Sequence, residues 1–296
     1  MNGFVKVLCL LMGLSLLTAG CEVFEPPQDV KIPDEAFLNA LIDLGIDHNE
    51  DGAISTREAE EIPHLDVGNR GISDMTGIEA FIDLERLYCW QNQLTSLDVT
   101  KNTALTDLHC GYNQLTSLNL SNNTALVNLT CEGNQLSQLD LSNNKALEHL
   151  DCNENQLTSL NVSNNPAIAY FSCASNQLTN LDISSITSLS EMFCFSNQIT
   201  SLDFSNNPAL TDLYCALNQL SSLNITQSTA MTVLHCFTNQ LSTLDISNNT
   251  SLKNIQWRGN PSLNEICVWE LPFPPAGIEV DVYDTLIINF TTDCIE

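Results

Sequence analysis

The chain has 296 residues and carries 9 Lys plus Arg against 36 Asp plus Glu, which gives a formal net charge of −27 at pH 7. A surface this acidic repels nucleic acid and anionic membrane, so we expect neither as a partner. The acidic residues are spread along the chain rather than gathered in a tail, so we expect most of them on a solvated face.

The first residues have the composition of an export signal. One Lys and a long apolar run precede the ending LTAGC, and we interpret residues 1–20 as a signal peptide. The ending resembles the lipobox of bacterial lipoproteins, which implies cleavage before Cys21 and lipid attachment to its sulfur. The expected product is an exported lipoprotein of the cell envelope, at the outer membrane or the cell surface. The alternative is an ordinary signal peptide with a cysteine there by chance.

A tether and a helix follow. Residues 21–32 begin at the lipidated cysteine, and their Pro-Pro pair suits an extended linker. Residues 33–44 are predicted to form a helix, because Pro, Asp and Glu stand at its start and apolar residues recur at helical spacing. With the loop and second helix after it, this helix is expected to form an N-terminal cap over residues 33–63.

The loop in this cap has the pattern of a calcium site. Residues 47–58, DHNEDGAISTRE, resemble the twelve-residue loop of an EF-hand at every informative position, including the glycine at position 6. No second loop follows, which argues against a paired sensor, and we expect a structural calcium ion that braces the cap. The alternative is a metal-free turn closed by a capping box. The expected ligands are Asp47, Asn49, Asp51, Ala53 (through its carbonyl), Ser55 and Glu58.

A 21-residue repeat organises the chain from Leu84 to Ser251, and its most regular member is a cysteine. Trp257 occupies the same position in a ninth unit. Self-similarity at this period predicts a solenoid in which each coil buries its apolar residues against its neighbours. Each half of the repeat alternates inward and outward residues, so we expect a strand on both faces of each coil and little helix. The repeated cysteines are Cys89, Cys110, Cys131, Cys152, Cys173, Cys194, Cys215 and Cys236.

These cysteines are expected to pack in the core rather than to bind metal or form disulfides. Neighbouring coils would hold them about 4.8 Å apart, whereas a disulfide needs Cβ atoms about 3.8 Å apart. A single file also cannot surround one zinc ion tetrahedrally. Free cysteine behaves as a small buried hydrophobe, which suits this position.

Both halves of the repeat end in asparagine. One column runs from Asn92 to Asn260, and a second runs from Asn102 to Asn249 with Ile186 and Ser228 as exceptions. An inward amide at a coil corner can bond backbone groups that the turn leaves unpaired. We therefore expect both columns to be structural.

The frame LxxLxCxxNQLTSLDVSxN over residues 84–260 resembles the bacterial leucine-rich repeat class with nested 10- and 11-residue halves, a relative of internalin-type repeats. The segment His64–Phe81 looks like a slightly longer first repeat of that kind. The resemblance implies a leucine-rich repeat solenoid over residues 64–260, curved and mostly β, with a small helical N-terminal cap and a β-rich C-terminal cap. It also implies a role in binding rather than catalysis.

The last segment, residues 261–296, resembles the C-terminal cap of such proteins. Strand-like runs occur at Ile278–Tyr283 and Leu286–Phe290. Cys267 and Cys294 lie outside the repeated file, and export permits oxidation, so we predict that they form a disulfide.

The outward residues beside each cysteine are the candidate ligand-binding positions. They form an N-terminal and a C-terminal aromatic cluster, and contiguous exposed aromatic residues usually mark an interaction surface. Packing across strands is the alternative. The acidic and amide stretch between the clusters, Glu132, Asp151, Asn153 and Glu154, is expected to be solvated. The candidate ligand-binding residues are Tyr88, Trp90, Tyr112, Phe193, Phe195, Tyr214, His235 and Phe237, with His109 beside the first cluster.

Together these features predict a lipid-anchored cell-envelope protein that binds a protein or a glycan. The alternative is a structural or adhesive envelope protein without one specific ligand. Catalysis is not expected, because the sequence has no GxSxG, HExxH or phosphate-binding glycine loop. We also expect Glu132 and Asp151 to face solvent with nothing to shift their pKa values, and the histidines to lie on different coils without a nucleophile.

Overall fold

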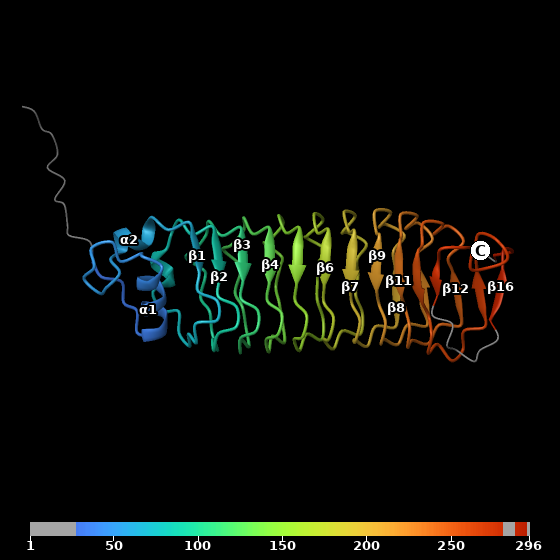
Figure 1. Ribbon diagram of the computed structural model, residues 1–296, viewed down its shortest axis with the longest axis horizontal. Helices are drawn as coiled ribbons and strands as arrows, with labels where there is room; N and C mark the ends of the chain where they lie inside the picture. Colours follow the sequence, from blue (N-terminus) through green and yellow to red (C-terminus); the bar gives the residue numbers. More distant parts are fainter. Residues whose placement is uncertain (1–27, 281–287, 295–296) are drawn as a thin grey trace, which may run out of the picture.

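The computed structural model describes residues 28–280 and 288–294. They form a solenoid whose coils stack along the long axis, with a helical cap at the N-terminal end (Figure 1). The expected signal peptide and the lipidation site Cys21 lie outside the described residues. Among the described helices, none has the length and apolar character needed to cross a bilayer.

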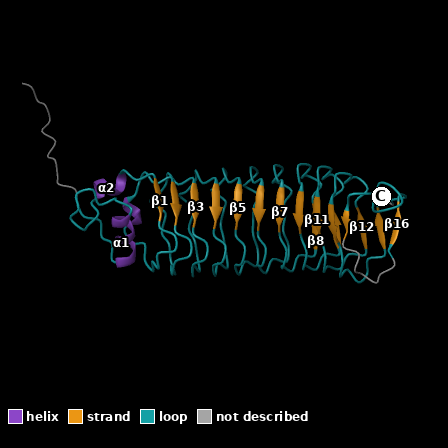
Figure 2. Cartoon of the chain, in the orientation of Figure 1, coloured by secondary structure: helices purple, strands orange, loops and turns teal. Residues whose placement is uncertain are grey.

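One face of the solenoid is an 11-stranded parallel sheet (Figure 2). Its register pairs the same position of successive repeats, for example Leu87 with Leu108 and Leu108 with Leu129. The constant register follows from the constant repeat length and confirms the expected leucine-rich repeat solenoid. The strands are β1 (His64–Asp66), β2 (Arg86–Tyr88), β3 (Asp107–His109), β4 (Asn128–Thr130), β5 (His149–Asp151), β6 (Tyr170–Ser172), β7 (Glu191–Phe193), β9 (Asp212–Tyr214), β11 (Val233–His235), β13 (Asn254–Gln256) and β15 (Glu279–Val280).

The other half of the coil has strands only toward the C-terminal end of the described chain, so the expectation of a strand on both faces of each coil is wrong for the earlier coils. Alternation specifies which side chains are buried, but a strand also needs backbones that pair. Asparagine side chains link successive coils along this half whether or not it forms strands, as where Asn123 Nδ2 donates to the Val99 carbonyl at 3.0 Å and Asn249 Nδ2 donates to the Ile225 carbonyl at 3.1 Å. The strands of this half are β8 (Ser201–Asp203), β10 (Ser222–Asn224), β12 (Thr243–Asp245), β14 (Glu265–Cys267) and β16 (Asn289–Thr291).

The apolar positions of the repeat form one continuous core. In one coil Leu105, Leu108, Cys110 and Leu115 are all fully buried. Each buried leucine contributes about 1.5–3 kcal/mol relative to an exposed one, so the stack is stabilised coil by coil. The repeated cysteines are all buried and free, and burial raises the pKa of the Cys89 thiol to about 12. Their expected role in core packing is confirmed.

The two asparagine columns differ in how completely they are bonded. In the first, Asn113 Nδ2 donates to the carbonyls of Cys89 and Cys110, each at 3.0 Å, and its Oδ1 accepts from the Leu94 amide at 3.1 Å. In the second, Asn123 Nδ2 donates to two carbonyls, but its buried Oδ1 has no partner. Both columns are structural, as expected, and the first makes the fuller set of bonds.

The N-terminal cap contains helices α1 (Glu35–Asp43) and α2 (Thr56–Glu60), followed in the first repeat by the short 3-10 helix η1 (Ile78–Ala80). Asp34 begins α1 by accepting from the Phe37 amide at 2.9 Å. Its other carboxylate oxygen accepts from the Ser73 amide at 2.9 Å and the Asp74 amide at 3.0 Å. One side chain thus caps the helix and fixes it to the first repeat.

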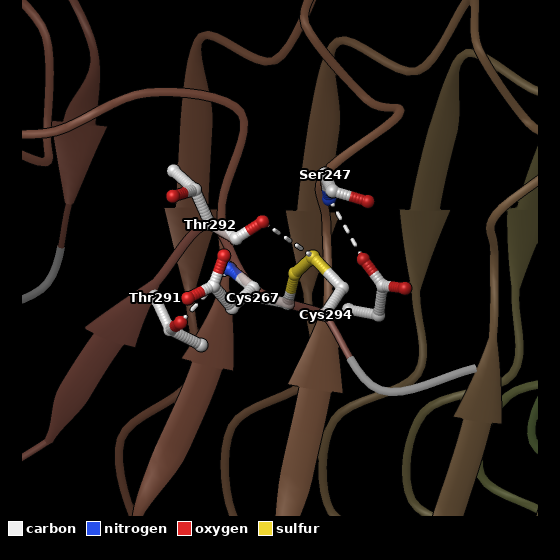
Figure 3. Close-up of a disulfide and its surroundings, with 7 residues drawn as sticks. Ser247, Cys267, Thr291, Thr292 and Cys294 are labelled. Carbon is white, nitrogen blue, oxygen red and sulfur yellow. Dashed lines mark hydrogen bonds between the residues drawn. A yellow bond between two sulfur atoms is a disulfide. The ribbon is translucent and has the colours of Figure 1, made fainter.

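The C-terminal cap continues both faces of the solenoid, through β15 and β16. Residues 281–287 of the two expected strand runs lie outside the described residues. Cys267 and Cys294 are joined by a disulfide, with Cα atoms 5.5 Å apart (Figure 3). Asp245 lies beside the two sulfurs and accepts a hydrogen bond from the Ser247 amide at 2.9 Å. Because both sulfurs are used by the disulfide, these three residues do not form a metal site.

Candidate binding surface

The outward residues of the 11-stranded sheet, together with the two residues after each cysteine, form a surface that we call the sheet face. Four positions per coil contribute, at three and one before the cysteine and one and two after it. Since the register is constant, each position forms a column along the solenoid. The repeat fixes the backbone of this face, and the sequence varies only in what each column carries.

A row of six rings crosses the C-terminal half of the sheet face. The first pair, His149 and Tyr170, stacks at 4.2 Å between centroids with an interplanar angle of 6°. Phe193 and Tyr214 stack at 4.7 Å and 8°. The row therefore holds most of the expected C-terminal cluster and extends it toward the N-terminus. Its members are His149, Tyr170, Phe193, Tyr214, His235 and Phe237.

The expected N-terminal cluster is not a single set of rings. Tyr88 contacts His109 at 4.5 Å, but Trp90 and Tyr112 lie over glycines instead. A Cβ at Gly68 would collide with the Trp90 indole, and one at Gly133 would collide with the Tyr112 ring. Both rings remain accessible, Trp90 at 37% and Tyr112 at 48%.

Three residues of this face were missed from the sequence. His149 and Tyr170 stand three positions before their cysteines, a column that alternation also turns outward, whereas the expected binding residues stand one position before or one or two positions after a cysteine. Leu217 stands two positions after Cys215 and is 45% exposed. Its φ of 55° is the left-handed conformation that this position adopts throughout the repeat, as at Gln91 with 51° and Ser196 with 56°. What sets Leu217 apart is its side chain, because most coils carry a polar residue or glycine at this position.

Leu217 borders a hollow of about 310 Å³ in the sheet face. Its walls are almost wholly apolar. Phe195 and Phe237 come from the coils on either side. In the coil between them the equivalent position holds Ala216, whose small buried side chain leaves the space open. We call this hollow the apolar pocket. Its lining is Phe195, Tyr214, Ala216, Leu217, His235 and Phe237.

The acidic residues between the aromatic groups are less solvated than expected. We call Glu132, Asp151 and Glu154 the acidic patch. Burial raises the pKa of the Glu132 carboxyl, with Asp151 and Glu154 adding repulsion, and burial likewise raises the pKa of Asp151. The expectation that nothing shifts the pKa values of Glu132 and Asp151 is therefore wrong. The cause is packing across coils, since the Glu132 carboxylate lies over Gly111 of the preceding coil, where a side chain would collide with it.

One oxygen of Glu132, Oε2, is buried and has no hydrogen-bond partner. On the next coil the Asn153 side chain is oriented by other bonds, since its Oδ1 accepts from the Ser172 hydroxyl at 2.7 Å and the Ala174 amide at 2.6 Å. A buried carboxylate oxygen without a donor is costly. The patch can therefore gain free energy from a cation or donor brought by a ligand.

The centre of the sheet face has no basic side chain to neutralise this charge. Lys145 is the one Lys or Arg between Asp107 and Phe237, and it lies exposed in the turn after the second asparagine column. Burial lowers the pKa values of His109 and His149, which favours their neutral form. The face thus presents apolar and acidic groups together.

The candidate calcium loop is closed by its own backbone. Asp47 accepts from the amides of Asp51 at 3.2 Å and Gly52 at 2.9 Å, and Gly52 has a φ of 81°. Glu58 accepts from the Ser55 amide and the His48 amide, each at 2.9 Å, and the Ser55–Glu58 capping box is present. Burial of Glu58 raises its pKa, but the hydrogen bonds from Ser55 and His48 outweigh that effect and lower it.

The donor set of this loop fits calcium in kind. The oxygens of Asp47, Asn49, Asp51 and Ser55, the Ala53 carbonyl and the Glu58 carboxylate are all hard ligands. Glu58 is buried, and no ion pair of the described residues includes it. The carboxylates of Asp47, Asp51 and Glu58 do not all come within 4.8 Å of one another, so metal binding requires the loop to close further.

The loop also binds the start of the described chain. The Val30 amide donates to the Ile54 carbonyl at 2.7 Å, and the Thr56 amide donates to the Gln28 carbonyl at 2.8 Å. These bonds form a short antiparallel bridge between Asp29 and Ser55. The tether is therefore fixed to the cap before the chain enters α1.

Comparison with known proteins supports the interpretation of the repeats. No protein-family model matches the chain. It is 35% identical to internalin J of Listeria monocytogenes serotype 4b (strain F2365) over 71 residues, which are 24% of this chain and 8% of internalin J. A solved structure of the functional domain of InlJ from Listeria monocytogenes, which includes a cysteine ladder, has a TM-score of 0.75 at 32% identity. That match covers 82% of this chain and 57% of the InlJ chain.

Two further solved structures share the fold at lower identity. Internalin C2 from Listeria monocytogenes has a TM-score of 0.61 at 22% identity, over 66% of this chain and 90% of that chain. YopM, a leucine-rich effector protein from Yersinia pestis, has a TM-score of 0.61 at 24% identity, over 74% of this chain and 60% of that chain. The chain is thus a leucine-rich repeat solenoid similar to internalins, a fold typical of protein-interaction surfaces.

Proposed function

We propose that this chain is a lipid-anchored cell-envelope binding protein that presents its sheet face to a protein ligand. The observation that carries the proposal is the apolar pocket, in which Leu217 is exposed between Phe195 and Phe237. An apolar hollow rimmed by aromatic side chains has the composition of an interface hot spot. The rest of the repeat supplies a rigid support for it.

The ring geometry favours a protein over a glycan. Sugars bind to aromatic residues by stacking on an open ring face. In the row of six rings, Phe193 and Tyr214 stack on each other, and so do His149 and Tyr170, so much of their face area is already covered. Apolar side chains can instead enter the pocket between the ring edges.

The test compares two exposed apolar residues on different surfaces. Leu217→Ala removes the exposed side chain of the pocket, and Ile82→Ala removes one that is 47% exposed outside the sheet face. Purified wild-type protein and both variants are incubated with surface proteins from candidate target cells, crosslinked, and analysed by mass spectrometry, with a glycan array in parallel. We expect ligand capture to fall in Leu217→Ala and to persist in Ile82→Ala.

The alternative of a structural or adhesive spacer without one ligand predicts the same capture by all three proteins. Hits on the glycan array that are lost in Leu217→Ala would instead assign the pocket to a carbohydrate. Either result would overturn the assignment of this face to a protein ligand.

The proposed anchor rests on the LTAGC ending and on the short tether fixed to the cap at residues 28–30. Cys21→Ser should move the protein from the membrane fraction to the soluble fraction and remove the mass of the lipid. An unchanged distribution would contradict the lipoprotein assignment. Whether the envelope site is the outer membrane or the cell surface is decided by protease accessibility on intact cells.

We also propose that calcium binds the loop of residues 47–58 and stabilises the cap. Because Glu58 supplies the last two oxygens of such a loop, Glu58→Gln should abolish the effect of calcium on the melting temperature. Glu60→Gln, on the same helix but exposed, is the matched control and should keep it. A wild-type melting temperature that does not change between calcium and chelator would refute the proposal.

The proposal does not include catalysis. The raised pKa of Glu132 or Asp151 meets one requirement of an acid catalyst, but the histidines of the sheet face are engaged in ring contacts, as His149 is with Tyr170. Turnover of any substrate that is lost in Asp151→Asn would reverse this assignment.

A further inference from the structure

We propose that the ligand segment recognised by the sheet face is an extended, basic stretch of protein. It carries a Lys or Arg that contacts the acidic patch and, about four to six residues away, a large apolar side chain that enters the apolar pocket. The inference rests on the proposed function and names the chemistry of the partner. It links the acidic patch and the apolar pocket, which the constant register places along the same face of the solenoid.

The pocket provides the first contact. Its walls come from three successive coils, so it is held open by the same stacking that holds the core. A volume of about 310 Å³ exceeds that of any single side chain, and the lining offers almost no hydrogen-bonding group. A leucine, methionine or aromatic side chain of the ligand would bury both itself and Leu217.

The acidic patch provides the second contact. Glu132 Oε2 lacks a donor, and the carboxylates of Glu132, Asp151 and Glu154 repel one another. A guanidinium or ammonium group would supply the missing hydrogen bond and reduce the repulsion at once. An acidic or neutral ligand group would do neither.

The spacing between the contacts follows from the coils. Glu132 and Asp151 flank the third and fourth repeated cysteines, and Leu217 follows the seventh. At about 4.8 Å per coil, three to four coils span about 14–19 Å, which an extended segment at about 3.3 Å per residue crosses in four to six residues. On the first coil along this path Ser172 and Ala174 are small and buried, so the segment can lie close to the backbone there before it reaches Phe195 at the pocket.

Charge also sets the direction of the segment. Glu132, Asp151 and Glu154 lie on the coils N-terminal to the pocket, and their carboxylates attract a basic ligand residue to that end. The pocket lining at the other end is almost wholly apolar and offers such a residue no carboxylate. The basic residue of the ligand therefore points toward the N-terminal coils.

The test uses synthetic peptides of about twelve residues in a Ser/Asn background, each with one Arg and one Phe, at every separation from adjacent to about nine residues. Binding to the purified full protein is measured by fluorescence anisotropy at low and high salt. We expect the affinity to peak at separations of four to six. Glu132→Gln combined with Asp151→Asn should weaken the best peptide about tenfold and reduce its salt dependence, as expected for loss of a close charge contact.

The matched control removes the same charge elsewhere. Asp140 and Asp182 lie in the other half of the coil, and each accepts a hydrogen bond from the serine amide two residues on. Asn161 occupies the equivalent position and makes the same bond, so Asp140→Asn with Asp182→Asn preserves the turn. This control should bind the best peptide as the wild type does.

Several results would overturn the inference. They are absence of binding by all peptides, no dependence on separation, and equal weakening by both double variants. If Leu217→Ala abolishes capture of a protein ligand while the acidic variants do not affect it, the proposed function stands and the basic segment is wrong. If neither change affects capture, both proposals fail.

Discussion

Two asparagines of adjacent corners offer a direct test of what holds the coils together. Asn155 belongs to the first column, and its Oδ1 accepts from the Leu136 amide at 2.9 Å while its Nδ2 donates to the carbonyls of Cys131 at 3.0 Å and Cys152 at 3.2 Å. Asn144 belongs to the second column. We predict that Asn155→Ala destabilises the protein more than Asn144→Ala does.

The magnitude follows from what each truncation leaves unpaired. Asn155→Ala orphans the buried Leu136 N–H, at about 1–3 kcal/mol, and removes bonds to carbonyls worth about 0.5–1.5 kcal/mol each, although Cys131 and Cys152 keep other amide donors. The total is about 2–6 kcal/mol.

Asn144→Ala leaves no group wholly unpaired. The carbonyls of Leu120 and Asn123, to which Asn144 donates, keep backbone donors from Asn123 and Leu126. The substitution also removes the unpartnered Asn144 Oδ1 and its desolvation penalty. We expect a net cost of about 0–2 kcal/mol, which lies below the range expected for Asn155→Ala.

The assay is urea unfolding followed by circular dichroism, with the free energy of unfolding compared at equal m-values. Burial alone predicts the opposite order, because Asn144 is 0% exposed and Asn155 is 8% exposed. An equal or larger loss in Asn144→Ala would therefore refute the hydrogen-bond reasoning and assign the columns to packing.

Three further predictions follow from the packing of the sheet face and the C-terminal cap. Because burial raises the pKa values of Glu132 and Asp151, the folded state binds protons more readily than the unfolded chain does. Wild type should gain stability relative to Glu132→Gln/Asp151→Asn as the pH falls from about 7 toward the ordinary values of 4.5 and 3.8. A pH-independent difference in urea unfolding would contradict this. Gly111→Ala should displace the Glu132 carboxylate and move its pKa toward the ordinary value, as measured by NMR titration. The equivalent position of another coil holds Ala174, which shows that the backbone there tolerates a Cβ. Replacing both Cys267 and Cys294 by serine should cost about 3–4 kcal/mol, the loop-closure value for a sequence separation of 27. Peptide mass mapping without reduction checks that the bond is present, and an unchanged unfolding free energy would contradict its stabilising role.

The solenoid was predictable from the sequence because the same apolar, cysteine and asparagine positions recur in every repeat. Burial of the cysteine column, the amide bonds at the corners and the helix that begins after Asp34 follow from local pattern and composition. The strands of the second half were not predictable, because strand pairing depends on how closely neighbouring backbones approach. That distance results from the stacking of whole coils and is not encoded in any one repeat.

The candidate site was predictable in part for the same reason. Alternation identified Phe193, Tyr214 and Phe237 as outward residues, and the structure brings them together. It did not identify the raised pKa of Glu132, whose carboxylate packs over a glycine one coil earlier, or the apolar pocket beside Leu217, which three successive coils line. Such features arise between coils, and a single repeat does not contain them.

The inward and outward positions of the repeat have different roles, and this difference explains how such a surface is built. Positions that face inward are nearly invariant along the chain because each must match its neighbours in the stack, whereas the four outward columns are free to differ from coil to coil. The information that specifies a ligand must therefore lie where the outward columns depart from a polar background. In this chain the departures are an aromatic row, an exposed Leu217 and a half-buried Glu132, and all of them lie on the sheet face. A ligand that bound the opposite half of the coils would meet the repeated, hydrogen-bonded turns such as Asp140–Ser142, which offer the same chemistry at each coil and so cannot fix one register.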